Sequence, residues 1–451
     1  MTAIENSMTA LADLLWGNWM LYFLLGLGIY YTAVTGMLQI RSIPYILREL
    51  LGKNRKALRE NETSGSLSSM QALYTAVASC VGSGNIVGVA TALIAGGPGA
   101  LFWMWLAAFF GMATKYGEIV LGLCTREKDE NGMYQGGPMY YIAQGLRAPW
   151  LGTAAAVLLF IQNAGATLIQ SNTISSVALE VFSIPRIVTG LVLAFAMSFI
   201  IRGGLKRLAG TAQGIVPVMS GIYILGGAVV VLSHPQNFVP MLRDIIQGAF
   251  SMEAGMGAAV GITMKEAMRY GVARGLYSNE AGEGSAAVIH SSAQVDHPSV
   301  QGVYGVAEVF IDTMVICSTT GFAILSSGIR LQGASAATLA ATAFSTVFPA
   351  FKYVVSTSLI LFAATSIMSQ WYFGHVSLVY IKSKRGDMIY RFIFPVLILY
   401  GSLSTVTMVW AIQDCMLGLL IIPNVITLFV LSPKVRRLTK EFNIIMKESR
   451  L

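Results

Sequence analysis

The segment SCVGSGNIVGVA, residues 79–90, places helix-weakening residues inside a long apolar stretch. It contains glycine at 82, 84 and 88, and the polar residues Ser83 and Asn85. Each glycine weakens a helix by about 1 kcal/mol relative to alanine, and serine and asparagine side chains compete for backbone hydrogen bonds. An unwound turn in lipid is tolerable only where its bare carbonyls and amides face a cavity or a ligand. The chemistry indicated here is therefore binding by the main chain.

Two other interpretations of these glycines compete with binding. Small residues at helical spacing also let transmembrane helices pack closely, and this alternative stays open for any single glycine pair. A dinucleotide-binding loop does not fit, because the spacing is G-x-G-x-x-x-G and no βαβ unit surrounds it.

Two acidic residues stand four apart in another apolar stretch, so Glu308 and Asp312 share one face of a helix. Acids at membrane depth are rare and functional by default. Asp312 is therefore a candidate for proton coupling or for orienting a ligand, and a structural hydrogen bond is an equal alternative.

The polar stretch 262–300 holds residue types that occur in hydrolase and metal sites. They are Glu283, Ser285, His290, Asp296 and His297. Nothing in their spacing orients a nucleophile, a base and a third group, and the four cysteines are too scattered for a disulfide framework or a metal site. We interpret this stretch as a cytoplasmic loop and expect no enzymatic activity.

The composition is that of a membrane protein. The chain has 451 residues, of which 55% are hydrophobic and only 12% are charged. Soluble domains carry about 25% charged residues. Apolar runs of roughly 20 residues recur about eleven times, and they lack the alternation of a transmembrane barrel. The predicted fold is an all-α polytopic bundle with spans at 16–39, 68–94, 98–123, 150–183, 187–201, 209–232, 243–262, 301–326, 346–374, 389–409 and 413–432.

Basic residues predict the orientation of this bundle. They cluster in the loop 40–60 and in the tail 434–451, whereas the residues before Trp16 carry no base. By the positive-inside rule the N-terminus lies outside the inner membrane and the C-terminus lies in the cytoplasm. The net charge of +8 then marks the inner membrane face, and no nucleic-acid partner is needed to explain it.

A second glycine-rich interruption, at Gly255, Gly257 and Gly261, falls in the predicted seventh span. Five crossings separate it from the break at residues 82–88, so the two broken helices enter the membrane from opposite sides. This arrangement is typical of an inverted repeat of transporter type, with a site between the two breaks. The predicted units are an extra helix and basic loop (1–66), two five-helix repeats (67–240 and 241–433) and a tail (434–451).

Several longer motifs resemble the alanine/glycine:cation symporter family, also called the sodium:alanine symporters. They are AGGPGALFWMWLAAFFGMATKYGE (95–118), VGSGNIVGVATA, GVARGLYSNEAGEGSA (271–286), GGPMYY (136–141) and IQSNTIS (169–175). The resemblance covers most of residues 70–380. It implies a LeuT-type 5+5 inverted repeat preceded by one extra helix, and uptake of small neutral amino acids coupled to sodium or, less often, to protons.

The resemblance also implies a substrate site. The family binds its amino acid at the unwound part of the first repeat helix, which here is Ser83, Gly84 and Asn85. Exposed amides at the start of a half-helix suit a carboxylate. Gln170 on the fourth span would bind a polar end of the amino acid, and Trp371 would limit its side chain to a hydrogen or methyl group. The structural alternative for Gln170 is a hydrogen bond between helices, and that for Trp371 is an anchor at the membrane interface. Gly257 in the second break completes the predicted site.

By analogy with LeuT-type proteins, sodium would lie between the carbonyls of Ala78 and Val81 and the hydroxyls of Thr365 and Ser366. A hard cation needs about five or six oxygens, and an unwound helix frees carbonyls. The family usually has its Ser-Thr pair one position later, so Ser366 is the firmer ligand. Hydroxyls bonded to the carbonyls of their own helix are the structural alternative for both.

The expected function is sodium-coupled symport of alanine and glycine by alternating access, with sodium as the co-transported ion. The expected partners are the small neutral amino acid and membrane lipid, with no obligatory protein partner. A proton-coupled symporter of the same fold is the nearest alternative, and a passive facilitator or channel is a more distant one.

Overall fold

The structure is a computed structural model that describes residues 3–51, 67–130, 132–250, 263–404 and 407–448. The chain folds into a helical bundle, and its described strands form one short antiparallel pair, β1 (Glu127–Lys128) with β2 (Tyr134–Gln135). Before residue 240 the helices are α1 (Ala3–Leu15), α2 (Asn18–Thr35), α3 (Leu38–Arg41), α4 (Ile43–Leu51), α6 (Ser69–Cys80), η2 (Ser83–Asn85), α7 (Val87–Gly96), α8 (Gly99–Thr125), α9 (Pro138–Gly145), α10 (Pro149–Phe182), α11 (Arg186–Ile201), α12 (Gly204–Ser233) and the start of α13 (Pro235–Phe250).

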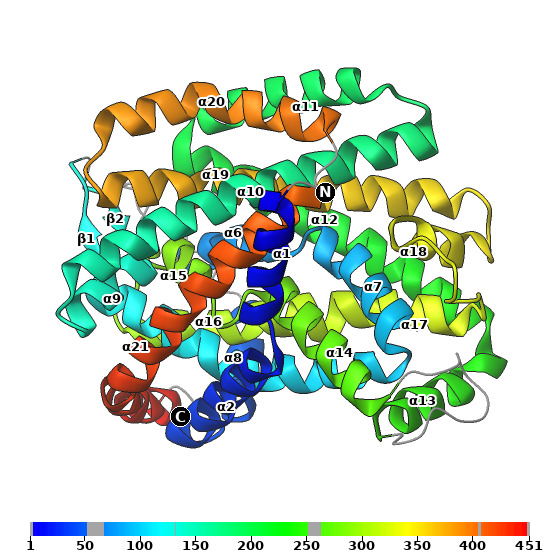
Figure 1. Cartoon of the computed structure of the whole chain (residues 1–451). Coiled ribbons are helices and arrows are strands. Elements are labelled where there is room, and N and C mark those ends of the chain that lie inside the picture. The colour runs from blue at the N-terminus through cyan, green and yellow to red at the C-terminus, as the bar shows by residue number, and fades with distance from the viewer. Residues whose placement is uncertain (1–2, 52–66, 131, 251–262, 405–406, 449–451) are drawn as a thin grey trace.

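The second half repeats this pattern of long helices joined by short connections (Figure 1). Its helices are α14 (Met264–Asn279), α15 (Ser285–His290), α16 (Pro298–Val309), η3 (Phe310–Cys317), α17 (Ser318–Ser326), α18 (Ala336–Ser345), α19 (Phe351–Tyr380), α20 (Lys384–Leu403) and α21 (Thr407–Glu448). The unit η3 is a π-helical stretch that joins α16 to α17 without an interruption.

Most of the predicted spans correspond to helices in the structure. Seven described helical units are each long and apolar enough to cross a membrane: α8, α10, α12, α16–η3–α17, α19, α20 and most of α21. The pair α6 and η2–α7 meets the same length and composition requirement when taken together, with a bend of 62° between its two parts. The helices α2 and α11 are apolar but shorter. The chain is therefore a multi-pass membrane protein, and the expected total of about eleven crossings is confirmed only in part.

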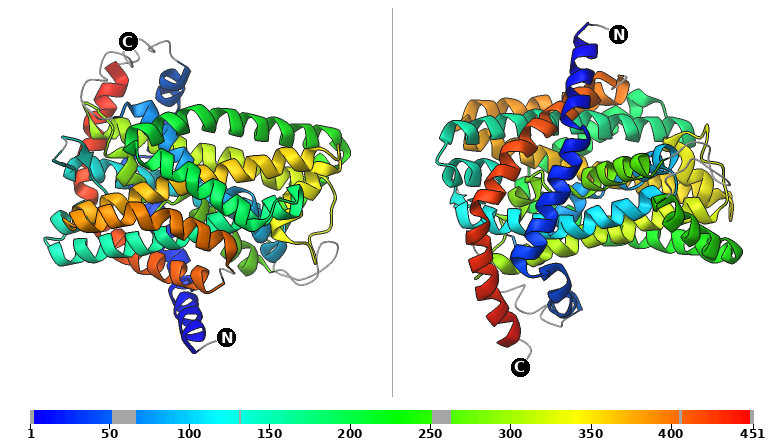
Figure 2. Two further views of the ribbon diagram at one scale, coloured as in Figure 1. Left: turned by 90° about the horizontal axis from the view of Figure 1, so that it is seen from above. Right: turned by 60° about the horizontal axis from the view of Figure 1, so that its bottom comes forward.

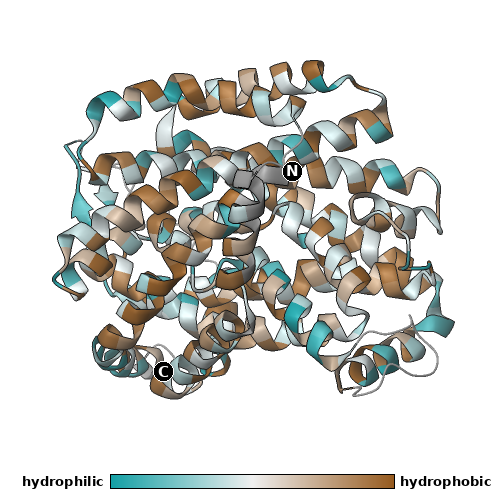
Figure 3. Ribbon diagram, viewed as in Figure 1, coloured by the Kyte–Doolittle hydropathy of each residue, from teal (hydrophilic) through white to brown (hydrophobic). Residues whose placement is uncertain are grey.

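The outer helices present apolar side chains to their surroundings. Phe195 on α11, Leu232 on α12 and Phe392 on α20 are 79%, 76% and 74% exposed. Hydrophobic residues are frequent along these same helices in Figure 3. Such large exposed apolar surfaces would be unstable in water, so these faces are suited to contact with lipid.

The N-terminal helices run parallel to the last helix. Trp16 donates its indole N–H to the carbonyl of Asp414 at 3.0 Å, and the Tyr31 hydroxyl donates to the carbonyl of Leu428 at 2.7 Å. Figure 2 shows α1 beginning and α21 ending at opposite ends of the molecule. The expected extra helix is thus held against α21. The last helix, α21, continues without interruption into the predicted tail as far as Glu448.

The prediction that residues 262–300 form a cytoplasmic loop was wrong. Most of this stretch is helical, with α14 packed against α7 and α8, and α15 packed against α6 and α8. All six residues of α15 are buried. The sequence resembled a loop because the helices are short and carry polar residues, whose partners lie on distant helices.

The second interruption of the bundle therefore lies at residues 280–284, between α14 and α15. We call residues 81–86 break 1 and residues 280–284 break 2. The helix before break 1, α6, packs against the helix after break 2, α15. Likewise α7, after break 1, packs against α14, before break 2. The two broken helices are therefore antiparallel. This relation agrees with the expected inverted repeat. The predicted interruption at Gly255, Gly257 and Gly261 lies outside the described residues.

Candidate functional site

The side chain of Asn85 stabilises the unwound backbone of break 1. The Gly82 amide, which would continue the helical ladder onto the Ala78 carbonyl, donates instead to Asn85 Oδ1 at 2.9 Å. Gly82 is extended, with φ −143° and ψ −151°, and the short turn η2 follows it. The chain then enters α7, which leaves Ser83, Gly84 and Asn85 buried between two half-helices. The unwinding expected from the sequence is present.

Both polar ends of the Asn85 side chain are engaged within the protein. Its Nδ2 donates to Asp312 Oδ1 at 2.6 Å and to the Asp312 carbonyl at 3.2 Å. The Asp312 carboxylate also accepts from Ser278 Oγ, at 2.9 Å to Oδ2, and from Thr313 Oγ1 at 2.8 Å. Ser278 lies at the end of α14, just before break 2. Asp312, within the π-helical η3, therefore connects the two broken helices, and π-helical turns often occur at such functional positions.

The four predicted sodium ligands fall into two classes. Ser366 Oγ lies within hydrogen-bond distance of two carbonyls, Phe362 of its own helix at 3.1 Å and Val81 of break 1 at 3.2 Å, and the second contact brings α19 and break 1 together. Thr365 Oγ1 donates to the Phe362 carbonyl at 2.9 Å, within its own helix. Ala78 lies in the last turn of α6, shortly before Val81 in the sequence. Carbonyls and hydroxyls of this kind are the oxygen donors that a hard cation prefers.

Break 2 has a backbone that glycine makes possible. Gly282 and Gly284 have φ values of +97° and +86°, which residues with a side chain rarely adopt. Glu280 has φ +56°, in the left-handed region where a residue with a side chain is strained. Such strain persists only where surrounding contacts hold it, and it clusters at functional sites.

A buried ion-pair network holds the start of break 2. Lys115 on α8 is fully buried, and its Nζ donates to Glu308 Oε1 at 2.6 Å and to the Asn279 carbonyl at 2.5 Å. The other Glu308 oxygen contacts His290 Nε2 at 3.0 Å. The ammonium group thus caps the last carbonyl of α14, where a cation is favourable because of the helix dipole.

Asn424 on α21 holds the middle of break 2. Its Nδ2 donates to the Gly282 carbonyl and to Glu118 Oε1, each at 2.8 Å. The Tyr141 hydroxyl donates to Asn424 Oδ1 at 2.5 Å. Break 2 is therefore fixed from α8, α9 and α21, although little in the local sequence marks it as a membrane-embedded turn.

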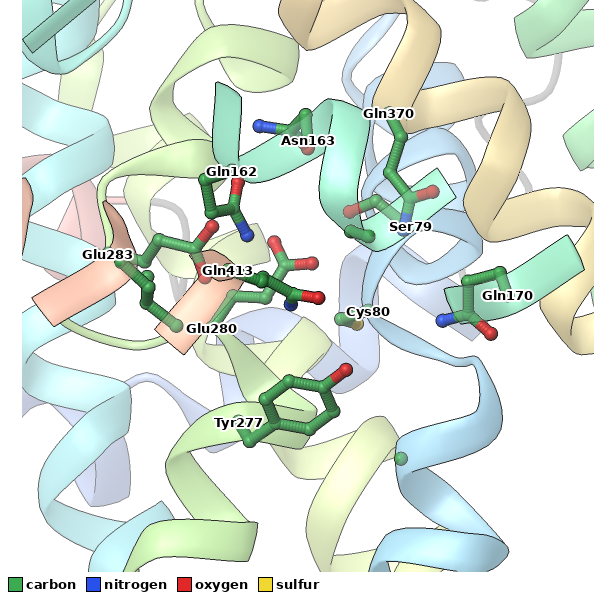
Figure 4. A pocket seen from close by; sticks show the side chains of 13 residues that line it. Ser79, Cys80, Gln162, Asn163, Gln170, Tyr277, Glu280, Glu283, Gln370 and Gln413 are labelled. Atoms are coloured by element: carbon green, nitrogen blue, oxygen red, sulfur yellow. The ribbon is translucent and has the colours of Figure 1, made fainter. Parts of the chain in front are cut away.

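A polar cavity lies between the two breaks, and Figure 4 shows the side chains that line it. Gly84 contributes from break 1, and Glu280 and Glu283 contribute from break 2. The other lining residues come from α6, α10, α14, α19 and α21: Ser79, Cys80, Gln162, Asn163, Ala166, Gln170, Tyr277, Gln370, Gln413 and Leu417. A polar cavity bordered by unwound main chain can bind a small polar molecule. Among the described residues no group of three or more acidic, histidine or cysteine side chains is placed to hold a metal.

The predicted substrate residues do not all lie at this cavity. Gln170 lines it, and its Oε1 accepts from the Ser83 amide at 3.4 Å. Trp371 is outside the lining and buried, with its ring stacked on His375 at 5.4 Å between centroids. The neighbouring Gln370 lines the cavity instead. Gly257 lies outside the described residues.

Sequence reasoning missed the contributions of break 2, of α21 and of the first half of α10. Glu280, Glu283, Gln162 and Gln413 all line the cavity. One signal was present, because GVARGLYSNEAGEGSA belonged to the motifs of the resemblance, and it places two glycines beside two acids. Because this stretch is polar, it was interpreted as a loop and not as part of the site.

One end of the two broken helices is closed by backbone pairing. The Leu67 amide donates to the Ser292 carbonyl at 3.0 Å, and the Gln294 amide donates to the Leu67 carbonyl at 2.9 Å. Arg126 Nη1 donates to the carbonyls of Ser291 and Ala293 at 3.0 and 2.5 Å. The segment before α6 is thus joined to the segment after α15.

Comparison with known proteins gives three findings. A family model described as "Sodium:alanine symporter family" matches residues 1–450. The "Sodium/alanine symporter AgcS" of Methanococcus maripaludis is 38% identical over 442 residues, covering 96% of each chain. The "Putative sodium/proton-dependent alanine carrier protein YrbD" of Bacillus subtilis is 34% identical and covers 95% of this chain and 90% of that protein.

Comparison with solved structures identifies the fold. The structure described as "Crystal structure of MhsT in complex with L-phenylalanine" aligns with a TM-score of 0.58 at 12% identity. It covers 83% of this chain and 98% of that one. At this identity the likeness concerns the fold alone, which is of the LeuT type.

Proposed function

This chain belongs to the sodium:alanine symporter family, and from that membership we propose that it imports alanine and glycine together with sodium by alternating access. The family establishes a transporter rather than an enzyme. The choice of alanine and glycine as substrates, sodium as the coupling ion, and the residues that bind them are our proposals.

The observation that carries the proposal is the polar cavity between two broken, antiparallel helices. Main-chain groups at break 1 are turned away from helical pairing, because Asn85 accepts the Gly82 amide. An amino-acid carboxylate would bind the amides at the start of η2 and α7, where the helix dipole is positive. Ser83, Gly84 and Gln170 would provide these contacts, with Asn85 positioning the turn.

Sodium would bind where Ser366 meets the Val81 carbonyl, with Ala78 and Thr365 completing the oxygen set. The ion would hold break 1 in its unwound form, and the same form presents the amides to the substrate. Binding of ion and amino acid would therefore be coupled, and the coupling must be reciprocal. The basic loop 40–60 would face the cytoplasm, with the N-terminus outside.

Uptake by proteoliposomes tests this proposal directly. Purified protein is reconstituted, and labelled alanine uptake is measured under an imposed sodium gradient, an imposed proton gradient, or neither. We expect accumulation above equilibrium only with sodium. Accumulation driven by protons alone would favour the proton-coupled alternative, and equilibration without accumulation would favour a facilitator.

Equilibrium binding provides an independent test. Sodium should increase the affinity for alanine, and alanine should increase the affinity for sodium by the same factor. Alanine affinity that does not change across millimolar sodium concentrations would contradict the proposed coupling.

A further inference from the structure

A sharp turn separates α2 from the two short helices that follow it. Gly36 has a left-handed backbone, with φ +66°, and it ends α2. Helical hydrogen bonds then continue through Ser42, because its amide donates to the Leu38 carbonyl and its carbonyl accepts the Ile46 amide. The helices α3 and α4 therefore form one helical segment, residues 38–51, which we call the surface helix.

One side of the surface helix packs on the bundle. The Tyr45 ring contacts the Phe442 ring of α21, with 5.4 Å between the centroids and an angle of 82° between the planes. The Tyr304 hydroxyl of α16 donates to Glu49 Oε2 at 3.4 Å. Figure 2 shows the surface helix beside the end of α21, at the end of the molecule opposite to the N-terminus. The surface helix is thus fixed to two helices of the bundle.

The other side of the surface helix is apolar and exposed. Ile40, Ile43 and Leu47 recur at intervals of three and four residues, so they lie on one helical face. They are 47%, 47% and 51% exposed. Arg41 and Arg48 are also exposed, and their spacing of seven residues places them in one row. An exposed apolar face beside basic side chains is typical of a helix that lies in a membrane interface.

The end of α21 adds positive charge beside the surface helix. Arg436 and Lys440 are exposed and stand one turn apart, and neither forms an ion pair with another described residue. One turn further, Ile444 is 60% exposed. The exposed charged side chains of the two helices are mostly basic: Arg41, Arg48, Arg436, Arg437 and Lys440, against the acids Glu49 and Glu441.

The position of this surface favours lipid as its partner. The apolar stretch of α2, Trp19–Thr35, is about 26 Å long at 1.5 Å per residue, close to the roughly 30 Å of membrane hydrocarbon. Its end at Gly36 therefore lies near the level of the phospholipid headgroups. There, acyl chains can cover an apolar face that would be unfavourable in water, and headgroup phosphates can pair with arginine and lysine.

We propose that the surface helix and the end of α21 together bind anionic phospholipid. The headgroup phosphates would contact the basic side chains, and the acyl chains would cover Ile40, Ile43 and Leu47. This inference does not depend on the transported substrate or on the coupling ion. Because Tyr304 and Phe442 attach the surface helix to α16 and α21, lipid bound here would also hold the ends of those two helices.

Lipid binding to the purified full-length protein tests this inference. Native mass spectrometry measures the dissociation constants of phosphatidylglycerol and of phosphatidylcholine with the same acyl chains. We expect phosphatidylglycerol to bind at least about tenfold more tightly, because a basic side chain near a membrane surface contributes about fivefold and several act together. Equal affinities for the two lipids would overturn the inference.

A pair of charge variants assigns the preference to this surface. Arg436→Gln with Lys440→Gln should reduce the preference for phosphatidylglycerol by at least about fivefold. Arg202→Gln with Lys206→Gln is the matched control, because it removes two exposed basic side chains at the same spacing from the connection of α11 and α12. The control should leave the preference unchanged. An equal reduction in both double variants would overturn the inference, since positive charge at any position would then be sufficient.

A cysteine on the apolar face tests the acyl contact separately. In nanodiscs of phosphatidylglycerol, Leu47→Cys should react with a water-soluble maleimide at least about tenfold more slowly than Lys384→Cys, because a thiol in apolar surroundings forms less thiolate. Lys384 is exposed and polar, and the unsubstituted protein gives the background of the native cysteines. Equal rates would show that the apolar face is open to water, which would overturn the inference and favour a protein partner for this face.

Discussion

The side-chain amide of Asn85 donates to the Asp312 carboxylate at 2.6 Å, across 227 positions of the chain. The same asparagine accepts the Gly82 amide, and the same aspartate accepts Ser278 Oγ. One hydrogen-bonded pair thus joins break 1 to the end of α14. Two buried side chains therefore link the two broken helices through one hydrogen-bond network.

Asp312→Asn is expected to reduce coupled alanine uptake by at least about tenfold, because an amide cannot accept from Asn85, Ser278 and Thr313 together. Uptake in proteoliposomes at a fixed sodium gradient measures this. The thermal midpoint of the purified variant reports whether the loss is one of folding. Unchanged sodium-driven uptake would remove Asp312 from the mechanism.

Gly82→Ala is expected to abolish uptake for steric reasons. An added Cβ would lie 2.6 Å from Ser366 Oγ and 2.9 Å from Gln170 Nε2. Gly88→Ala is the matched control, because its Cβ would meet no atom within 4 Å. The control position lies in α7, where alanine stabilises a helix by about 1 kcal/mol relative to glycine. Initial uptake rates of the two variants should therefore differ strongly, and equal rates would contradict the close packing at break 1.

Ser366→Ala is expected to raise the half-saturating sodium concentration by about tenfold, since one oxygen ligand is lost. Thr365→Val should have a smaller effect, because both hydroxyls contact the Phe362 carbonyl of their own helix but Ser366 also contacts the Val81 carbonyl of break 1. The sodium dependence of alanine uptake measures both variants. A larger effect for Thr365→Val would place the ion on the other side of α19.

Lys115→Met should destabilise the protein by about 3–5 kcal/mol, because it leaves the buried Glu308 without its cation. The double variant Lys115→Met with Glu308→Gln removes both charges and should recover a large part of this loss. Denaturation of the detergent-solubilised protein compares the single and double variants in a double-mutant cycle. A double variant that is no more stable than Lys115→Met would show that the ion pair is not the cause.

Break 1 could be predicted because its signals are local. Glycine and asparagine act on the helix in which they stand, and the hydrogen bond from the Gly82 amide to Asn85 spans three residues. The apolar spans were also predictable, since lipid requires long apolar helices. Gln170 was carried over from a motif, and it lines the cavity.

Break 2 could not be located in the same way. Its polar residues indicate a loop when only the local sequence is considered, because the groups that satisfy them are distant. Lys115 reaches the Asn279 carbonyl from 164 positions away, and Asn424 reaches the Gly282 carbonyl from 142 positions away. Trp371 and Gln370 are adjacent in sequence, and only the packing of α19 decides which of them lines the cavity.

The sequence by itself determined that this protein is a membrane-embedded helical transporter with an unwound first repeat helix, because composition, span length and helix-weakening residues act locally. Only the tertiary structure decided where the second break lies and which side chains face the cavity. Those features depend on hydrogen bonds and packing between helices that are far apart in the chain, and a linear pattern does not encode which of several polar residues meet.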